Sequence, residues 1–192
     1  MKNFIELYDN ALTSDECKYI IDFMNVSVLT PGHVRIGNEK RVAKEIKESH
    51  EITMDVSVKD TFPNEVNNLI NDVLYENTKK YVETHPQLLK LNRWSMIKKY
   101  NLQKYNPNEG YHALHCEVCG LKTSNRILAW MFYLNTVKDG GTYFDNYDLT
   151  MDAIEGRLVI WPAYWTHFHR GIVSKTETKY IATGWSGFID NV

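Results

Sequence analysis

Cysteine is scarce in this sequence, which has three (Cys17, Cys116 and Cys119) among 192 residues. An odd and low count argues against a scaffold stapled by disulfides and favours a reducing compartment. The sequence also lacks the run of about 18 apolar residues that a transmembrane helix needs, and its N-terminus has no signal-peptide pattern. We therefore expect a soluble, intracellular protein of the cytoplasm that has no membrane partner.

The sequence also lacks a large excess of either charge, because 22 basic and 24 acidic residues leave a net charge of −2. Nucleic acids and anionic membranes attract proteins through strong basic fields, so this balance argues against a nucleic-acid partner. A hydrophobic content of 43% suffices for one core, and residues 1–192 are expected to form a single domain. The sequence leaves the oligomeric state open.

Two helices are predicted in the first half of the chain. Thr13 and Glu16 have the spacing of a capping box, and apolar residues recur every three or four positions after them. This pattern predicts a helix over residues 14–25. Pro63 suits the first turn of a second helix, whose apolar stripe runs to about residue 83. The polar segment 27–50 is expected to be either a solvated loop or a flap over a binding site.

From residue 94 onwards the pattern changes to short strands separated by turn residues. The predicted strands occupy residues 94–105, 127–135, 157–161 and 179–185. Gly140 and Gly141 are expected to break the chain between two of them. The pattern predicts a fold that is mainly β with flanking helices. We expect a jelly-roll core over residues 94–189, with the helices, flap loop and supporting strands of residues 1–93 packed on one side.

Histidine and glutamate form the first pattern that carries chemistry. His115 and Glu117 are two residues apart, so on a strand their side chains would point to the same face. With a second histidine from a distant strand, His167 or His169, they would form the facial site of non-haem iron(II) oxygenases. By itself the pair is a weak signal, because short His/Glu pairs are common on protein surfaces.

Cys116 and Cys119 have the spacing of half a zinc site or of a redox pair. No second cysteine pair completes a zinc site, and no helix is predicted to begin there and lower a thiol pKa. We therefore expect two small buried thiols. Arg126 stands seven residues before Tyr133 on one predicted strand, so it is expected to point to the opposite face, away from the site.

Five ordered motifs make the second half resemble the 2-oxoglutarate and Fe(II)-dependent dioxygenases, in particular the prolyl-4-hydroxylase-like group. They are YNPNEGYHALHCE (105–117), RILAWMFYLN (126–135), GGTYF (140–144), EGRLVIWP (155–162) and HRGIVSKTETKYIATGW (169–185). The resemblance covers some 80 residues. It implies that the jelly roll is a cupin-like double-stranded β-helix.

The same resemblance implies that His115, Glu117 and His169 are the iron ligands. His169 is preferred to His167 because its distance from Lys179 and the Arg-Gly that follows it are similar to the family pattern. Most members have Asp where this chain has Glu117. A carboxylate at this position argues against halogenation, in which a small residue replaces the acid.

A cosubstrate site is implied as well. Lys179 is similar to the cation that holds the C5 carboxylate of 2-oxoglutarate, which a fixed ammonium group can bind. Tyr133 stands where the family often has a phenol that reaches the same carboxylate. Tyr105 is expected to bind the cosubstrate or to shape the pocket, and Trp185 is expected to wall the site.

The resemblance thus implies an Fe(II)/2-oxoglutarate-dependent dioxygenase that uses O2 to hydroxylate an unactivated C–H bond, with release of succinate and CO2. Ascorbate is a candidate additional cofactor. The expected substrate is a peptidyl proline, another amino-acid residue of a protein, or a small molecule, with contacts from Arg35, Lys40 and Arg41 in the flap. Two alternatives stay open: a non-catalytic jelly-roll binding module, and a metal-dependent cupin enzyme that does not use 2-oxoglutarate.

Overall fold

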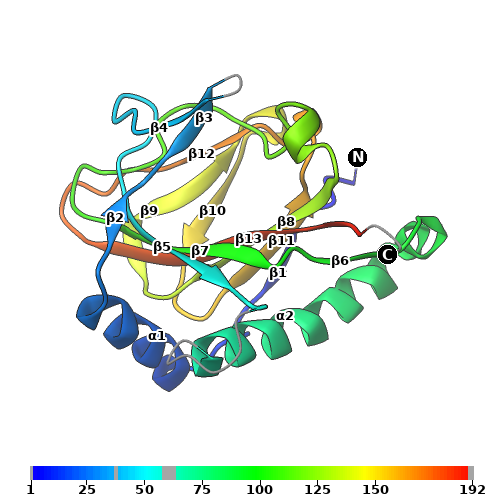
Figure 1. Cartoon of the computed structure of the whole chain (residues 1–192), viewed down its shortest axis with the longest axis horizontal. Coiled ribbons are helices and arrows are strands. Elements are labelled where there is room, and N and C mark those ends of the chain that lie inside the picture. Colours follow the sequence, from blue (N-terminus) through cyan, green and yellow to red (C-terminus); the bar gives the residue numbers. More distant parts are fainter. Residues whose placement is uncertain (1, 37–38, 58–63, 190–192) are drawn as a thin grey trace.

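The computed structural model describes residues 2–36, 39–57 and 64–189. Two sheets face each other, and two helices cover the outer side of the larger sheet (Figure 1). This is the predicted jelly-roll core with helices on one side. No helix in the described part of the chain combines the length and hydropathy that crossing a bilayer requires.

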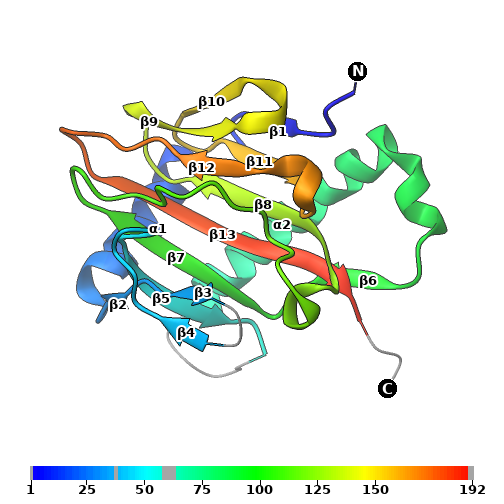
Figure 2. The same ribbon diagram turned by 90° about the horizontal axis from the view of Figure 1, so that it is seen from above.

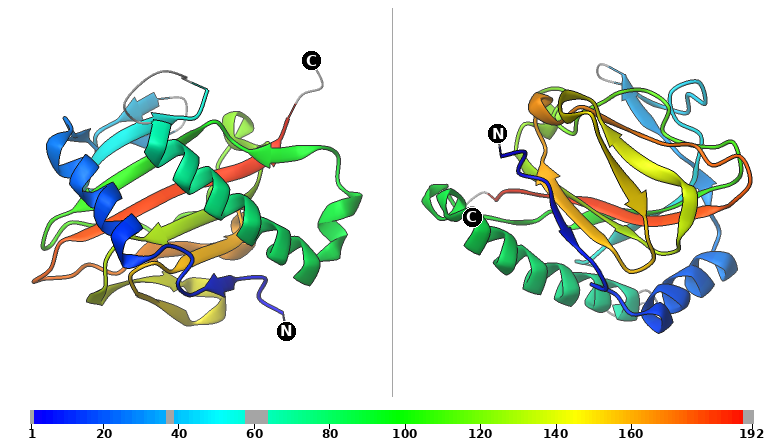
Figure 3. Two further views of the ribbon diagram at one scale, coloured as in Figure 1. Left: turned by 90° about the horizontal axis from the view of Figure 1, so that it is seen from below. Right: turned by 180° about the vertical axis from the view of Figure 1, so that it is seen from behind.

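The two helices are α1 (Ser14–Val26) and α2 (Asn64–Thr84). The predicted capping box is present in α1, since the Thr13 hydroxyl accepts from the Glu16 amide and the Glu16 carboxylate accepts from the Thr13 amide. Both helices lie across one face of the large sheet, as the left panel of Figure 3 shows. Pro63, the predicted first-turn residue of the second helix, lies outside the described residues.

The larger sheet has eight strands, four from each half of the chain. Its main path runs in the order β1 (Glu6–Tyr8), β11 (Leu158–Pro162), β8 (Arg126–Tyr133), β13 (Lys179–Phe188), β7 (Lys99–Tyr105), β5 (His50–Asp55) and β2 (Thr30–Pro31), with β6 (Trp94–Met96) beside β13. All of the pairings are antiparallel. Strands β8 and β13 lie at the centre, which agrees with the continuous apolar run predicted for β8.

The smaller sheet has three strands and lies opposite β8 and β13 (Figure 2). It consists of β10 (Leu149–Ala153), β9 (Val137–Phe144) and β12 (His169–Gly171). One buried cluster fills the space between the large sheet and the helices, and a second lies between the two sheets. The cavity described below lies at one end of the space between the two sheets.

Two strand predictions differ in detail from the structure. Gly140 and Gly141 lie inside β9 and do not break the chain. A Cβ atom on Gly141 would stand 2.1 Å from the Met151 carbonyl oxygen, so glycine permits the close approach of β9 and β10. The long strand predicted over 94–105 is split into β6 and β7.

The segment 27–50 is neither a plain loop nor wholly solvated. It contains β2 and a separate hairpin of β3 (Val34–Ile36) and β4 (Glu39–Arg41), and the side chains of Lys47 and Ser49 are buried. Lys47 is fixed because backbone hydrogen bonds join residues 46–48 to residues 110–113. The end of this segment therefore belongs to the site.

Candidate metal and cosubstrate site

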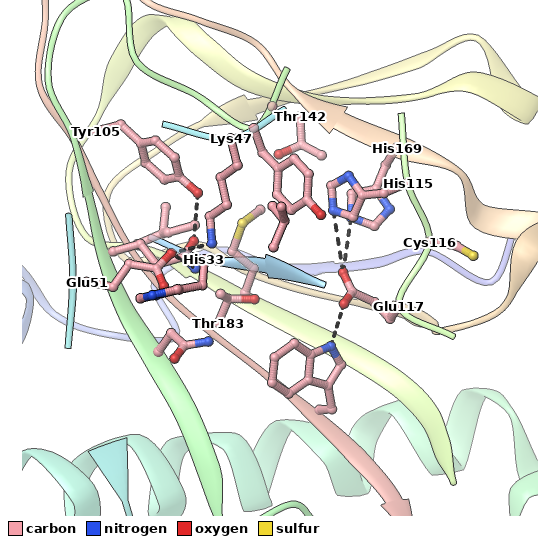
Figure 4. Close-up of a pocket in the computed structure, with 18 of the residues that line it drawn as sticks. His33, Lys47, Glu51, Tyr105, His115, Cys116, Glu117, Thr142, His169 and Thr183 are labelled. Carbon is pink, nitrogen blue, oxygen red and sulfur yellow. Dashed lines mark hydrogen bonds and ion pairs between the residues drawn. The ribbon is translucent and has the colours of Figure 1, made fainter. Parts of the chain in front are cut away.

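A cavity of about 500 Å³ opens between the two sheets (Figure 4). Its floor is the inner face of β5, β7, β13 and β8, and the hairpin adds Val34 and Lys40 to its wall. The residues predicted for the site from the sequence, His115, Glu117, His169, Lys179, Tyr133 and Tyr105, all line it.

His115, Glu117 and His169 converge at one end of this cavity. One ligand atom from each lies within 4.8 Å of the other two. Glu117 Oε1 stands 3.3 Å from His169 Nε2 and 3.8 Å from His115 Nε2. Figure 4 shows both imidazoles facing this single carboxylate.

The backbone fixes the two imidazoles before any metal binds. His115 and His169 exchange two main-chain hydrogen bonds of 2.9 Å each. His115 Nδ1 donates to the Ala113 carbonyl at 3.0 Å, and His169 Nδ1 donates to the His167 carbonyl at 2.9 Å. Each Nε2 is thereby left to face Glu117, as metal-binding histidines require.

The electrostatics of the cluster favour a cation. Burial and the neighbouring His169 lower the pKa of His115 to about 3, so its imidazole is neutral at physiological pH. Burial alone would raise the pKa of Glu117, but the hydrogen bond to His169 and the nearby His115 and Arg126 hold it below its usual range. Two imidazole nitrogens and an ionised carboxylate are the donor set of a divalent transition metal ion. The three side chains therefore fit the iron that the sequence predicts.

The local structure around the first histidine differs from the prediction. His115 and Glu117 lie in an irregular segment, in which His115 forms only an isolated bridge with His169. Glu117 is held instead by its amide, which donates to the Ala163 carbonyl at 3.0 Å. The two side chains still share one side because both backbone positions are tied to the chain around His169.

The structure distinguishes clearly between the two candidate histidines, His167 and His169. His169 begins β12 and faces the cavity. His167 ends a short 3-10 turn and is buried elsewhere, with Nε2 at 2.7 Å from the Asn3 carbonyl and Nδ1 at 2.9 Å from the Thr166 hydroxyl. Only His169 lies near His115 and Glu117.

The second oxygen of Glu117 has partners that the sequence did not predict. The Trp185 indole donates to Glu117 Oε2 at 2.6 Å, and Arg126 stands 3.5 Å from the same oxygen. The Arg126 guanidinium also stacks on the Trp185 ring, 3.5 Å from its centre. Trp185 therefore holds the carboxylate as well as walling the site.

The prediction that Arg126 points away from the site is wrong, and a β-bulge explains why. Gly187 pairs with Arg126 and Ser186 with Leu128, so Ile127 is an extra residue in β8. Ile127 and Leu128 both pack toward the helices, whereas Ala129 and the alternate residues after it face the other sheet. The alternation of faces breaks at this point, and Arg126 turns into the cavity.

Lys179 lies in the cavity away from the triad and is 5% exposed. Its ammonium group donates to the carbonyls of Gly140, at 2.6 Å, and Ile172, at 2.9 Å. No carboxylate of the described residues lies within 4 Å of it, and burial lowers its pKa to about 8. A buried ammonium without a counter-ion is suited to receive an anionic ligand.

The two predicted tyrosines have partners of their own. The buried Tyr133 hydroxyl pairs with the Thr142 hydroxyl at 2.7 Å. Tyr105 is the cross-strand neighbour of Lys179, whose ammonium lies 5.4 Å from the centre of its ring, and its hydroxyl donates to Gln103 at 2.7 Å. Tyr105 therefore shapes the wall beside Lys179.

A buried ion pair in the same cavity escaped sequence analysis. Lys47, from the predicted flap, pairs with Glu51, and their side chains are 5% and 9% exposed. Glu51 also accepts from Ser49 at 2.9 Å and Gln103 at 2.8 Å. The sequence shows that Lys47 and Glu51 are four residues apart, but no pattern in it indicates that the pair is buried.

The cysteine prediction is partly wrong. All three cysteines are free, and Cys17 is buried. Cys116 is only half-buried and Cys119 is exposed, although both line the cavity. Both are close to Glu117 in the chain, so their side chains lie at the cavity and not in the core.

The comparisons with known proteins agree with this geometry. Residues 100–187 match the 2OG-Fe(II) oxygenase superfamily. No curated protein matches the chain. Among solved structures, the prolyl-4-hydroxylase of Pseudomonas putida is similar with a TM-score of 0.69 and 12% identity, over 98% of this chain and 95% of that one.

Two further structures are similar over nearly the whole chain. The viral collagen prolyl hydroxylase vCPH from Paramecium Bursaria Chlorella virus-1, in its 2OG complex, has a TM-score of 0.65 and 15% identity over 97% of each chain. The prolyl hydroxylase from Trichoplax adhaerens, in complex with a hypoxia inducible factor peptide fragment, has a TM-score of 0.70 and 14% identity over 97% of this chain and 84% of that one. The match of residues 100–187 to the 2OG-Fe(II) oxygenase superfamily, together with the fold shared with prolyl hydroxylases, supports an Fe(II)/2-oxoglutarate-dependent dioxygenase.

Proposed function

We propose that the protein hydroxylates an unactivated C–H bond in an amino-acid residue of a peptide or protein, with proline as the first candidate. The observation that carries this proposal is the convergence of His115, Glu117 and His169 in a cavity whose far end holds the buried Lys179. Iron(II) and 2-oxoglutarate, when bound, supply the oxidising chemistry that uses O2 and releases succinate and CO2. Ascorbate is a candidate auxiliary reductant.

Each group of residues has a proposed task. His115, Glu117 and His169 would hold the metal through Nε2, Oε1 and Nε2, and leave the remaining positions open. Lys179 would bind the C5 carboxylate of 2-oxoglutarate through its ammonium group. The Tyr133 and Thr142 hydroxyls line the same end, where each can donate to a carboxylate oxygen. Tyr105 would exclude water from that end.

The proposal of a peptide substrate rests on the solved structures that share this fold. The Trichoplax adhaerens structure holds a peptide fragment in a fold that this chain shares. The lining of the cavity here includes hydroxyl and amide side chains, which suit the backbone of a peptide. A metal-dependent enzyme that does not use 2-oxoglutarate is the alternative. The buried ammonium of Lys179, which has no carboxylate partner among the described residues, argues against it.

The test is an anaerobic titration with Fe(II) and 2-oxoglutarate that monitors the visible charge-transfer band of the chelate. We expect the band in the wild type and in His167→Ala, and its loss in His169→Ala. Lys179→Ala should need far more 2-oxoglutarate to give the band. A folded wild-type protein without the band would contradict the proposal, and a band that disappears only in His167→Ala would reverse the choice of histidine.

A further inference from the structure

The walls of the cavity carry an excess of positive charge, although the whole chain is slightly acidic. Among the described residues, two acidic side chains line the cavity, Glu51 and Glu117. Five basic side chains of the same residues line it: Lys40, Lys47, Lys99, Arg126 and Lys179. The cavity therefore has a surplus of three positive charges in a chain whose net charge is −2. Iron(II) and the dianion of 2-oxoglutarate cancel each other, so the loaded site keeps this surplus.

The buried basic groups are already assigned to neighbours or to the cosubstrate. Lys47 pairs with Glu51, Arg126 stands beside Glu117, and Lys179 lies at the proposed cosubstrate end. Lys40 and Lys99 remain, and both are exposed. The carboxylate nearest to Lys99 among the described residues is Asp55, at 3.9 Å, and Asp55 does not line the cavity.

The register of the sheet places a hydrogen-bond donor beside Lys99. Asn101 is two residues along β7 from Lys99, so both side chains point to the cavity face. In the next strand, Thr53 is the cross-strand partner of Asn101, and its hydroxyl donates to Asn101 Oδ1 at 3.0 Å. This bond uses Asn101 Oδ1, and no described residue accepts a hydrogen bond from Asn101 Nδ2, which is left to donate to a ligand.

We propose that the substrate is an acidic peptide segment, in which a carboxylate beside the hydroxylated residue binds to Lys99 and Asn101 while Lys40 faces it from the hairpin. The proposal rests on the proposed function and deepens it. An ammonium group next to an oriented amide N–H matches the two oxygens of one carboxylate. Both lysines lie at the rim, where charge governs the choice of partner and its rate of association.

The experiment uses full-length protein loaded with Mn(II) and 2-oxoglutarate. The probes are three fluorescent nine-residue peptides with a central proline, flanked by glutamate, glutamine or lysine. We expect the glutamate peptide to bind about tenfold more tightly than the glutamine peptide at low salt, and the lysine peptide to bind most weakly. The preference should shrink in 0.5 M NaCl, because salt screens exposed charges.

Two pairs of charge reversals give a matched comparison. Lys40→Glu with Lys99→Glu should abolish or invert the preference. Arg41→Glu with Lys98→Glu changes the net charge equally at the adjacent positions and should preserve the preference. Neither residue lines the cavity, so the structure does not support the substrate contact that the sequence predicted for Arg41. Asn101→Leu should reduce the advantage of the glutamate peptide over the glutamine peptide.

Equal affinity for the three peptides, preference for lysine, or no binding of any peptide would overturn the proposal. Binding of a short single-stranded oligonucleotide in place of the glutamate peptide would assign the lysines to phosphate groups and would also overturn it. Retention of Mn(II) and 2-oxoglutarate is measured in the same samples. Loss of either would instead contradict the proposed function, so the two failures are distinguishable.

Discussion

The indole N–H of Trp185 donates a 2.6 Å hydrogen bond to Oε2 of Glu117, the oxygen that faces away from the two histidines. Glutamate has one methylene more than aspartate and one more bond to immobilise. The contact with Trp185 and the nearby Arg126 restrict this longer side chain, so that Oε1 points to His115 and His169. The tryptophan thus acts as a positioning residue for a carboxylate that is longer than the family usually has.

Replacement of Trp185 by phenylalanine should therefore weaken metal binding. The ring would still wall the cavity, but Glu117 would lose its fixed orientation. Loss of such a supporting partner typically costs about 10- to 100-fold in metal affinity. Titration with Mn(II), followed by electron paramagnetic resonance, measures the change without turnover. Trp161→Phe is the control, because Trp161 also lines the cavity but its buried indole N–H has no hydrogen-bond partner among the described residues. Equal losses in both variants would contradict this role of Trp185.

Binding of 2-oxoglutarate should weaken as the pH rises through about 8. Burial lowers the pKa of Lys179 to about 8, so above this pH the free protein loses the ammonium that would pair with the cosubstrate. We expect the Kd to rise by up to about tenfold per pH unit above that point. Isothermal titration with Mn(II)-loaded protein from pH 7 to pH 9 measures it. The Lys179→Arg variant keeps its positive charge over this range, so its remaining affinity for 2-oxoglutarate should depend much less on pH. If its Kd rises with pH as steeply as that of the wild type, Lys179 is not the titrating group.

Lys47→Met should destabilise the protein by about 3 kcal/mol, because it leaves the Glu51 carboxylate buried without its cation. For a chain of this size the melting temperature should fall by roughly 6–12 °C. Lys44→Met is the matched control, since Lys44 pairs with Glu48 at the same spacing on the surface. That exposed pair is worth less than about 1 kcal/mol. The double variant Lys47→Met with Glu51→Gln should recover part of the loss.

Gly141→Ala should lower the free energy of unfolding by about 1–3 kcal/mol through overpacking. Its Cβ would meet the Met151 carbonyl oxygen at 2.1 Å, and that backbone belongs to a paired strand that cannot move freely. Gly120→Ala should have little effect, because nothing lies within 4 Å of the position of its Cβ. Urea denaturation of the two variants tests the contrast. A stable Gly141→Ala variant would mean that β9 and β10 can separate at no cost.

Local patterns in the sequence predict much of this fold. The capping box at Thr13 and the apolar run of β8 depend on neighbouring residues, so their spacing is sufficient to locate α1 and the central strand. Lys179 and the residues of the triad were found by motif order, and the structure brings them into one cavity. These features are visible because each depends on a short stretch of chain.

The residues that were misjudged depend on long-range relationships. Arg126 enters the cavity because β8 contains an extra residue relative to β13, and an alternation rule applied to β8 alone cannot detect this. Lys47 is buried because its segment is bonded to residues 110–113, some 65 positions later. Trp185 reaches Glu117 across 68 positions. Pairings of this kind are decided by the register between strands, which one sequence does not encode in any short window.

The main-chain bridge between His115 and His169 makes the shape of this site independent of its imidazoles. Both hydrogen bonds of the bridge join backbone atoms, so alanine at either position can form them. Variants with alanine at His115 or His169 should then remain folded and keep the cavity. Under the proposed function, such forms would bind a peptide substrate without turning it over, and they could serve as baits that retain it long enough to be identified.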